Sequence, residues 1–217
     1  MILDILFPHR CIHCNRLIDA EYIVCNLCFS QIHFTHFSYS ESNILKEKCS
    51  LLFPVENAYA LLRFEEKDVS RELIHELKYK DREKVGKTLA EWTTERLNFD
   101  HEKPDLLASV PLHPKKQKQR GYNQLHLFTE TLSDFYNIPY SHKLLKRNHY
   151  SKAQALKNKK LRLETKNIFS LNSNISGKHI LLIDDVFTTG NTLASISWEI
   201  LKAGNNRISI LVMAMDI

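Results

Sequence analysis

Three stretches of the chain are apolar at almost every position, namely residues 106–110, 179–183 and 207–215. After each of the first two, apolar residues recur every three or four positions, over 123–136 and 191–204. Strands that are apolar on both faces and alternate with amphipathic helices are typical of a parallel sheet with helices on both sides. The pattern therefore predicts an α/β fold.

The earlier part of the chain adds further elements to this prediction. Residues 59–64 favour a short strand, and residues 66–80 and 83–97 each place their apolar side chains on one helical face. Gly204 follows the apolar periodicity of 191–203 and is expected to cap that helix at its carboxyl end. Residues 38–50 are polar and are interpreted as a linker, whereas residues 137–179 show no assignable pattern. We therefore expect two domains, at 1–45 and 46–217.

Composition and charge restrict the class of protein. Of the 217 residues, 43% are hydrophobic and 25% are charged, as in a soluble globular protein. No apolar run reaches the roughly 18 residues that cross a bilayer. The start "MILDILFPHRC" contains Asp4 and lacks a basic beginning and a cleavage site, so we expect no signal peptide and a cytoplasmic location. The net charge of +5 permits an anionic partner without requiring one.

Two C-x-x-C pairs stand near the beginning of the chain, Cys11 with Cys14 and Cys25 with Cys28. Four thiolates at this spacing can surround Zn²⁺ as a tetrahedron, which leaves no position for a catalytic water. Disulfides are the alternative, but a chain without a signal peptide works in a reducing compartment. We expect a structural zinc that supplies the folding energy of this short region. The fifth cysteine, Cys49, is expected to be a small buried or linker residue.

Two adjacent acids, Asp184 and Asp185, follow the apolar run 179–183. Ligands of open parallel sheets bind outside the carboxyl ends of the strands, where these carboxylates can accept hydrogen bonds from ribose hydroxyls. The next residues offer hydroxyls and backbone N–H groups at a helix N-terminus, which suits a phosphate. An ordinary turn with a helix cap is the alternative for the short "TTG" alone. The predicted phosphate loop comprises Thr188, Thr189, Gly190, Asn191 and Thr192.

The segment "KKQKQRGYNQ" concentrates positive charge before Gly121. Its cations, and Mg²⁺ bound to phosphate oxygens, would neutralise a pyrophosphate group. Arg120 is the strongest candidate because its guanidinium can grip two phosphate oxygens. A solvated basic loop and a nucleic-acid contact, with Tyr122 stacking on a base, are the other readings. The cations are Lys115, Lys116, Lys118 and Arg120.

The string "LLIDDVFTTGNTL" resembles the motif with which type I phosphoribosyltransferases bind phosphoribosyl pyrophosphate (PRPP). The whole chain resembles the ComF (competence protein F) family through this string, the paired cysteines and three further segments. These segments are "LKYKD" (77–81), "SVPLHPKKQKQRGYNQ" (109–124) and "LLKRNHYSKAQALKNKKLR" (144–162). The resemblance implies a type I phosphoribosyltransferase fold at 46–217 behind a zinc ribbon at 1–45.

The resemblance also implies roles for particular residues. Asp184 and Asp185 would hold the ribose hydroxyls, and residues 188–192 would hold the 5-phosphate. Val110, Pro111 and Leu112 would belong to the pyrophosphate loop. Residues 115–120 would form a mobile loop over the site, from which Arg120 would act on the leaving group.

Two classes of function remain open on this sequence. The first is an enzyme that displaces pyrophosphate from PRPP with a nitrogen nucleophile. The second is a non-catalytic PRPP sensor or single-stranded-DNA-binding scaffold, because relatives of ComF are associated with DNA uptake in natural transformation and with a helicase partner. The fold alone cannot separate them. No residue pattern identifies an acceptor base.

Overall fold

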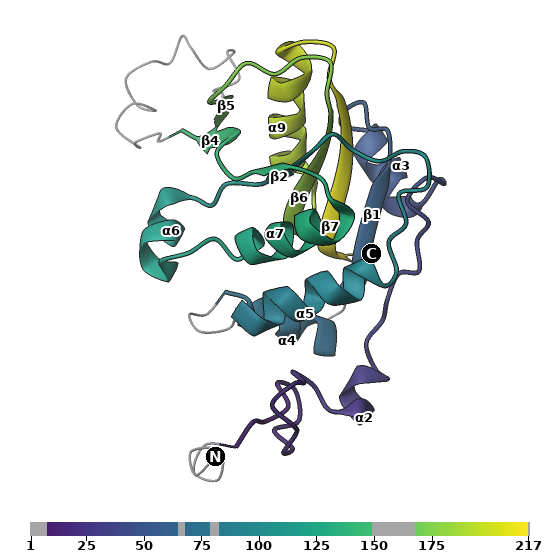
Figure 1. Ribbon diagram of the computed structural model, residues 1–217, viewed down its shortest axis with the longest axis vertical. Helices are drawn as coiled ribbons and strands as arrows, with labels where there is room; N and C mark the ends of the chain where they lie inside the picture. Colours follow the sequence, from purple (N-terminus) through teal and green to yellow (C-terminus); the bar gives the residue numbers. More distant parts are fainter. Residues whose placement is uncertain (1–7, 65–67, 79–82, 149–167, 217) are drawn as a thin grey trace.

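The computed structural model describes residues 8–64, 68–78, 83–148 and 168–216 (Figure 1). Its centre is a sheet of five strands in the order β1–β7–β6–β2–β3, in which every neighbouring pair runs parallel. The strands are β1 (Ala58–Phe64), β2 (Leu106–Ser109), β3 (Tyr140–Ser141), β6 (His179–Phe187) and β7 (Arg207–Asp216). The predicted α/β class, a parallel sheet flanked by helices, is confirmed.

Helices lie on both faces of the sheet. The connections from β1 to β2 and from β2 to β3 advance toward one edge, whereas the connection from β6 to β7 runs the other way. Because such crossovers are right-handed, helices of the two directions cover opposite faces. The first group is α4 (Val69–Glu76), α5 (Glu83–Thr94) and α7 (Leu125–Tyr136), and the second contains α9 (Asn191–Lys202).

Helix α3 (Ile44–Ser50) lies on the same face as α9. The indole Nε1 of Trp198 on α9 donates a hydrogen bond of 3.1 Å to the carbonyl of Leu52, just beyond α3. Residues 38–50 were predicted to be a linker, and this part of the prediction is wrong. The side chain of Asn43 accepts a hydrogen bond from the Lys46 amide and so starts a short helix that a polar composition had hidden.

Strands β2 and β6 are neighbours, yet their chains leave toward opposite faces of the sheet. Their pairing ends at Ser109 and Ile183. Strand β6 continues along β7 alone, from Asp184 opposite Val212 to Phe187 opposite Met215. The sequence had suggested that the strand ends at the two acids, whereas it runs past them to Phe187. A crevice therefore opens beside the acids, where β2 has turned away.

Two further predictions about local structure differ from the fold. Residues 115–120 are not a loop, because they belong to helix α6 (Pro114–Arg120), which begins with a proline and ends at left-handed Gly121 with φ 79°. Helix α9 ends at Lys202 with Ala203 as its C-cap, and Gly204 is not among the residues with a positive φ. A Cβ on Gly204 would meet the Ser176 hydroxyl oxygen at 2.4 Å, so close packing explains this glycine.

A small second sheet stands beside α9. It pairs β4 (Leu145–Arg147) antiparallel with β5 (Phe169–Leu171). The sequence shows no assignable pattern between 137 and 179, and among the described residues of this stretch the structure places β3, β4 and β5. Residues 149–167, which carry most of the segment used for the family resemblance, lie outside the described residues.

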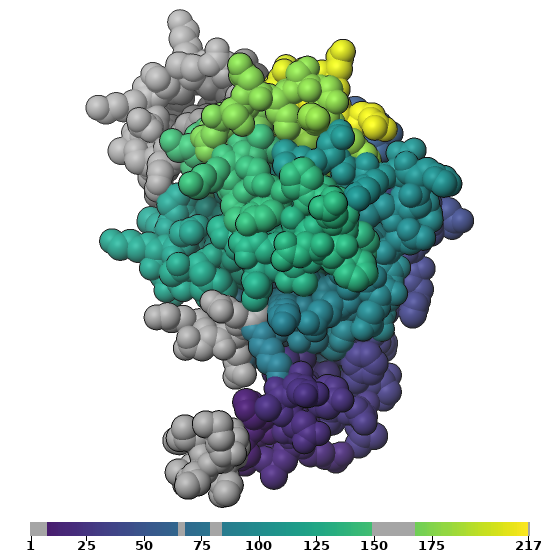
Figure 2. Space-filling view, viewed as in Figure 1, coloured from purple at the N-terminus to yellow at the C-terminus, as the bar shows by residue number. Residues whose placement is uncertain are grey.

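The cysteine-containing region forms a lobe at one end of the molecule, with the short helix α2 (Asn26–Phe29) (Figure 2). His13 Nδ1 lies 2.7 Å from Glu72 Oε2 of α4, and the ring of Phe29 packs edge-on against Trp92 of α5. The chain then runs antiparallel to β1, where Thr35 N donates to Leu61 O and Arg63 N donates to His33 O. This contact covers the free edge of β1.

The predicted domain boundary at residue 45 stays a prediction, although residues 33–35 already contact the sheet. Among the described residues, no helix combines the length and the apolar character that crossing a bilayer requires.

Candidate functional site

A cavity of about 250 Å³ occupies the crevice between β6 and β2. It brings together groups that are far apart in the sequence: the two acids, the loop after β2, cations from three elements and the start of α9. The lining residues are Lys78, Val110, Pro111, Leu112, His113, Lys116, Arg120, Gln124, Leu125, Arg147, Asp184, Asp185, Val186 and Thr192. The cavity thus collects both predicted acids, Arg120 and all three predicted residues of the loop after β2.

A larger cavity, of about 590 Å³, lies between the cysteine-rich lobe and helices α4 and α5. Of the predicted site residues it touches Cys11 alone, and the two acids are not part of its wall. Because it starts at Pro8, the first described residue, and gathers no converging acid pair, we place the candidate site in the smaller cavity.

The acid pair is held by hydrogen bonds rather than by ion pairs. The Asp185 amide donates to Asp184 Oδ1 at 2.9 Å, and the Val186 amide donates to Asp185 Oδ1 at 2.8 Å. Across 8–64, 68–78, 83–148 and 168–216, neither carboxylate forms an ion pair within 4 Å. Both acids therefore keep acceptor capacity toward the cavity.

The carboxyl of Asp184 has a raised pKa. Burial raises the pKa of its carboxyl well above the ordinary value, the negative charge of Asp185 raises it further, and Arg147 partly opposes both effects. A carboxylate in this state is stabilised by a cation or by hydroxyl groups that donate to it. The pair is thus suited to a ligand that brings one or both.

A hydrogen-bonded chain connects α6 to the acids. Arg120 donates to Gln124 Oε1 at 3.0 Å, and Gln124 Nε2 donates to Asp185 Oδ2 at 2.9 Å. Gln124 was not predicted as a site residue. Its position four residues after Arg120, at the N-terminus of α7, is the signal that could have found it.

The loop after β6 ends at the exposed N-terminus of α9. Gly190 precedes this helix with φ 73°, and no side chain caps it. A Cβ there would meet Leu52 Cδ1 at 2.6 Å, so both the backbone conformation and the packing require glycine. Thr188 and Thr189 are exposed, and Thr192 lines the cavity. Within the described part of the chain, the N–H groups of the first helical turn therefore have no side-chain cap beside the acids.

The predicted basic segment divides into two groups. Lys116 and Arg120 line the cavity, whereas Lys115 and Lys118 are exposed and are not in its wall. Two further cations of the wall, Lys78 and Arg147, were part of segments used for the resemblance but received no role. Arg147 also lies over the ring of Phe169, 5.2 Å from its centroid. Four cations against two acids favour an anionic ligand.

The four paired cysteines form the predicted metal site. The sulfur atoms of Cys11, Cys14, Cys25 and Cys28 all lie within 4.8 Å of one another, and Cys14 Sγ is 3.6 Å from Cys25 Sγ. Thiolates about 2.3 Å from a tetrahedral zinc would lie about 3.8 Å apart, so the cluster fits this ion. His13 lies outside the cluster and contacts Glu72 instead.

The environments of the sulfur atoms differ. Burial raises the pKa of Cys11, but backbone N–H groups of Cys14, Cys25 and His13 outweigh it and lower that pKa to about 6. Burial and the neighbouring thiols raise the pKa of Cys28. Outside the cluster, burial raises the pKa of Cys49 to about 12, as expected for an inert buried thiol.

Comparison with known proteins agrees with these features. Residues 2–39 match the double zinc ribbon domain family. The chain is 29% identical over 228 residues to Competence protein F of Haemophilus influenzae, covering 96% of this chain and 97% of that protein. It is 30% identical over 144 residues to DNA utilization protein YhgH of Escherichia coli K12, covering 64% of this chain and 63% of that protein, which is less than two thirds of its length.

Solved structures with a similar arrangement include the glutamine PRPP amidotransferase of Bacillus subtilis in complex with ADP and GMP. That match covers 66% of this chain and 30% of the other, with 19% identity and a TM-score of 0.40. A likeness at this TM-score supports no conclusion about function. The resemblance of the sequence to competence protein F and the presence of a zinc ribbon are confirmed.

The cysteine cluster predicts one zinc ion per chain. The substitution Cys25→Ser should abolish zinc retention and lower the melting temperature, because the metal supplies the folding energy of the ribbon. The matched substitution Cys49→Ala should keep the full zinc content. Elemental analysis of purified protein measures both, and a zinc-free wild-type chain would contradict the assignment.

The raised pKa of Asp184 predicts that this acid destabilises the unliganded protein at neutral pH. A raised folded-state pKa means that the folded chain binds the proton more tightly, so wild-type stability falls as pH rises from the ordinary aspartate range toward that raised value. The substitution Asp184→Asn removes this penalty and keeps the Oδ1 acceptor. We expect a higher melting temperature at pH 7, by about 2–4 °C for each kcal/mol relieved.

Melting curves between pH 4 and pH 8 test this expectation. The gain in Asp184→Asn should grow with pH and should be absent in Asp134→Asn, an exposed acid on α7. If the difference in melting temperature between Asp184→Asn and the wild-type chain shrank as pH rises, the predicted direction of the effect would be wrong.

Proposed function

We propose that this relative of competence protein F binds PRPP or ribose 5-phosphate in the crevice between β6 and β2. One observation carries the proposal: within a single cavity of about 250 Å³, two acids without ion-pair partners in the described chain face four cations beside an uncapped helix N-terminus. A ribose needs the acids, a 5-phosphate needs the helix N-terminus, and a pyrophosphate needs the cations. These three requirements are met at neighbouring positions.

Each element receives a role in this proposal. Asp184 and Asp185 accept hydrogen bonds from the ribose hydroxyls, and Gln124 holds Asp185 in position. The loop of Thr188, Thr189, Gly190, Asn191 and Thr192 holds the 5-phosphate. The pyrophosphate lies beside the loop of Val110, Pro111 and Leu112. Its charge is neutralised from α6 by Lys116 and Arg120.

The chemistry of the cavity fits Mg²⁺ bound together with PRPP. Mg²⁺ prefers oxygen ligands and keeps several waters, and the raised pKa of Asp184 indicates a carboxylate that a nearby cation would stabilise. Bound there, the ion would neutralise pyrophosphate oxygens. Asp184 and Asp185 are the residues that would face it.

A transferase reaction at this site would break the bond between ribose C1 and the pyrophosphate oxygen, and would form a bond from C1 to an acceptor nitrogen. Catalysis would consist of positioning and charge stabilisation. Asp184 and Asp185 would stabilise the positive charge that develops on the sugar, and Arg120 would stabilise the departing pyrophosphate. We propose this activity for a cytoplasmic protein, with the acceptor left to experiment.

The alternative is a sensor or scaffold that binds PRPP without transfer and contacts single-stranded DNA. Two observations favour considering it: Lys115 and Lys118 are exposed outside the cavity wall, and relatives carry names that refer to competence and DNA utilization. In this form the zinc ribbon and α6 would serve DNA uptake, with a helicase as a further partner.

PRPP with Mg²⁺ should raise the melting temperature of the wild-type chain. At a ligand concentration of 100 times Kd the gain is about 2.7 kcal/mol, which is roughly 5–10 °C for a chain of this size. Asp185→Asn should lose most of this shift, because it removes the charge and the Gln124 contact, whereas Asp134→Asn should keep it. Omitting Mg²⁺, without a chelator that would also remove zinc, should reduce the shift.

The wild-type chain is then tested for pyrophosphate release with a panel of nitrogen acceptors. Release that Arg120→Ala suppresses supports the transferase. PRPP binding without release by any acceptor supports the sensor, and absence of any PRPP-induced shift refutes the proposed ligand.

Single-stranded DNA binding, measured against salt concentration, tests the scaffold. Each phosphate contact contributes about 0.7 to the slope of log affinity against log salt, so Lys115→Ala and Lys118→Ala should each lower the slope by about that amount. Lys178→Ala is the matched control, because this exposed lysine precedes β6 at the opposite end of the sheet. An affinity independent of salt would exclude phosphate contacts.

A further inference from the structure

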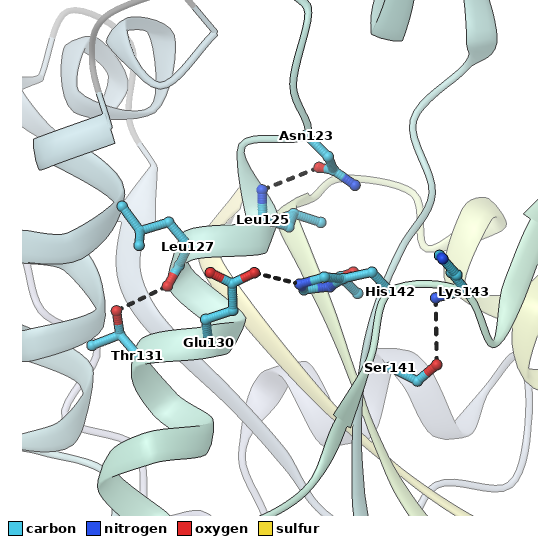
Figure 3. Close-up of polar contacts among 9 residues, drawn as sticks. Asn123, Leu125, Leu127, Glu130, Thr131, Ser141, His142 and Lys143 are labelled. Carbon is cyan, nitrogen blue, oxygen red and sulfur yellow. Dashed lines mark hydrogen bonds and ion pairs between the residues drawn. The ribbon is translucent and has the colours of Figure 1, made fainter.

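Three polar side chains next to the candidate site form a hydrogen-bonded series, here called the relay: Ser109, His142 and Glu130. Ser109 Oγ lies 3.0 Å from His142 Nδ1. His142 Nε2 lies 3.0 Å from Glu130 Oε1, and Figure 3 shows this second contact. Ser109 ends β2, His142 follows β3, and Glu130 belongs to α7. None of the three was predicted from the sequence.

Glu130 accepts a hydrogen bond from the Nε2–H group of His142. Nδ1 accepts a hydrogen bond from the Ser109 hydroxyl when the ring is neutral, and donates one to Ser109 Oγ when the ring is charged. In both protonation states the imidazole links the serine to the acid. It joins the end of β2 to the side of α7.

The surroundings hold the imidazole ring in place. His126, one helical turn before Glu130, stacks on His142 with ring centroids 3.7 Å apart and an interplanar angle of 15°. Burial, and then the charge of His142, lower the pKa of His126 to about 4, so this partner is neutral at physiological pH. Tyr140 lies on the same ring at 4.7 Å. The side chain of His142 is 16% exposed.

A serine, a histidine and an acid in series also occur in nucleophilic enzymes. Ser109 is 2% exposed, and it lines neither the candidate site nor the cavity beside the cysteine-rich lobe. A substrate cannot reach its hydroxyl, so the relay is not a nucleophile with its base.

The position of Ser109 indicates that the relay supports the loop after β2. The next residue, Val110, opens the loop that lines the cavity with Pro111 and Leu112. Val110 N donates to Ile183 O at 2.9 Å, and Asn123 Nδ2 donates to Val110 O at 3.1 Å. Asn123 also accepts a hydrogen bond from the Leu125 amide at the start of α7, as Figure 3 shows.

The start of the 110–113 loop is therefore held by three contacts: with β6 of the sheet, with Asn123 before α7, and through Ser109 with His142. We propose that His142, oriented by Glu130, is a positioning residue that sets the loop of residues 110–113 for the pyrophosphate group of PRPP. This inference rests on the proposed function and deepens it. It predicts a defect confined to the pyrophosphate end of the ligand, because the acids and the 188–192 loop belong to β6 and α9.

The inference is tested by comparing the binding of PRPP with that of ribose 5-phosphate, which lacks the pyrophosphate. His142→Phe keeps a ring against His126 and removes both hydrogen bonds, and Ser109→Ala removes only the hydroxyl. Each should weaken PRPP binding, with Mg²⁺ present, about 5–10-fold, as expected for one lost hydrogen bond. Affinity for ribose 5-phosphate should change less than about twofold, because this ligand lacks the pyrophosphate that the 110–113 loop would contact.

His126→Phe is the matched control, because it makes the same ring substitution in the stacking partner and removes no hydrogen bond of the relay. It should leave both affinities unchanged. Equal weakening of both ligands in Ser109→Ala would overturn the inference by indicating general damage to the site. Unchanged PRPP affinity in both Ser109→Ala and a folded His142→Phe would overturn it as well.

Failure of the proposed function gives a different result. In that case the wild-type chain binds neither PRPP nor ribose 5-phosphate, and the inference falls with it. A wild-type chain that binds both, with variants that keep the same ratio of affinities, rejects the role of His142 alone.

Discussion

The departure of two neighbouring strands toward opposite faces of the sheet is the constraint on which the site depends. Strands β2 and β6 pair only as far as Ser109 and Ile183. Beyond that point, β2 continues into the loop before α6 and β6 continues along β7. Backbone and side chains on both sides then face a shared crevice, as at the switch point of other open parallel sheets. Without this divergence the two acids would be covered by a neighbouring strand.

The crevice combines charges in a way that favours ligand binding over stability. Asp184 sits beside another acid and is partly buried, which costs free energy in the empty protein. Lys116 and Arg120 come from α6, which joins the sheet domain through the hydrogen bond from Tyr122 to the Leu77 carbonyl and the chain from Arg120 to Gln124. A bound anion with its cation would relieve both sets of like charges. Natural proteins often accept such local strain at functional sites.

The zinc ribbon is attached to the helices that approach the crevice. His13, inside the first cysteine pair, contacts Glu72 of α4, and the ammonium of Lys84 on α5 donates to the Ala20 and Tyr22 carbonyls of the lobe. Lys78, two residues beyond α4, lines the candidate site. A folded ribbon therefore constrains the helix pair from which Lys78 reaches the crevice. The same lobe leads into residues 33–35, which cover the edge of β1.

The sequence alone determined the parallel α/β class, the cysteine cluster and the position of two acids before a run of small polar residues. Each of these features depends on residues that are close together in the sequence. They are the aliphatic runs, the fixed cysteine spacing, and the acids followed directly by small polar residues. The nature of the bound ligand and the roles of the site residues stay predictions. Helix α6 was missed because none of its residues is buried and the segment has no apolar periodicity. Helix α3 was missed because Leu45 and Cys49 are its only buried residues, too few for a recognisable pattern. The ends of these helices depend on Asn43, Pro114 and Gly121.

Only the tertiary structure decided which distant residues meet. Gln124 beside Asp185, Lys78 and Arg147 in the same cavity, and His142 between Ser109 and Glu130 come from separate elements and have no shared sequence spacing. Gly204 was assigned to the wrong cause for the same reason, since its neighbour Ser176 is distant along the chain. Local patterns encode elements because hydrogen bonding and burial repeat along the chain, whereas contacts between elements depend on strand order and on crossover direction.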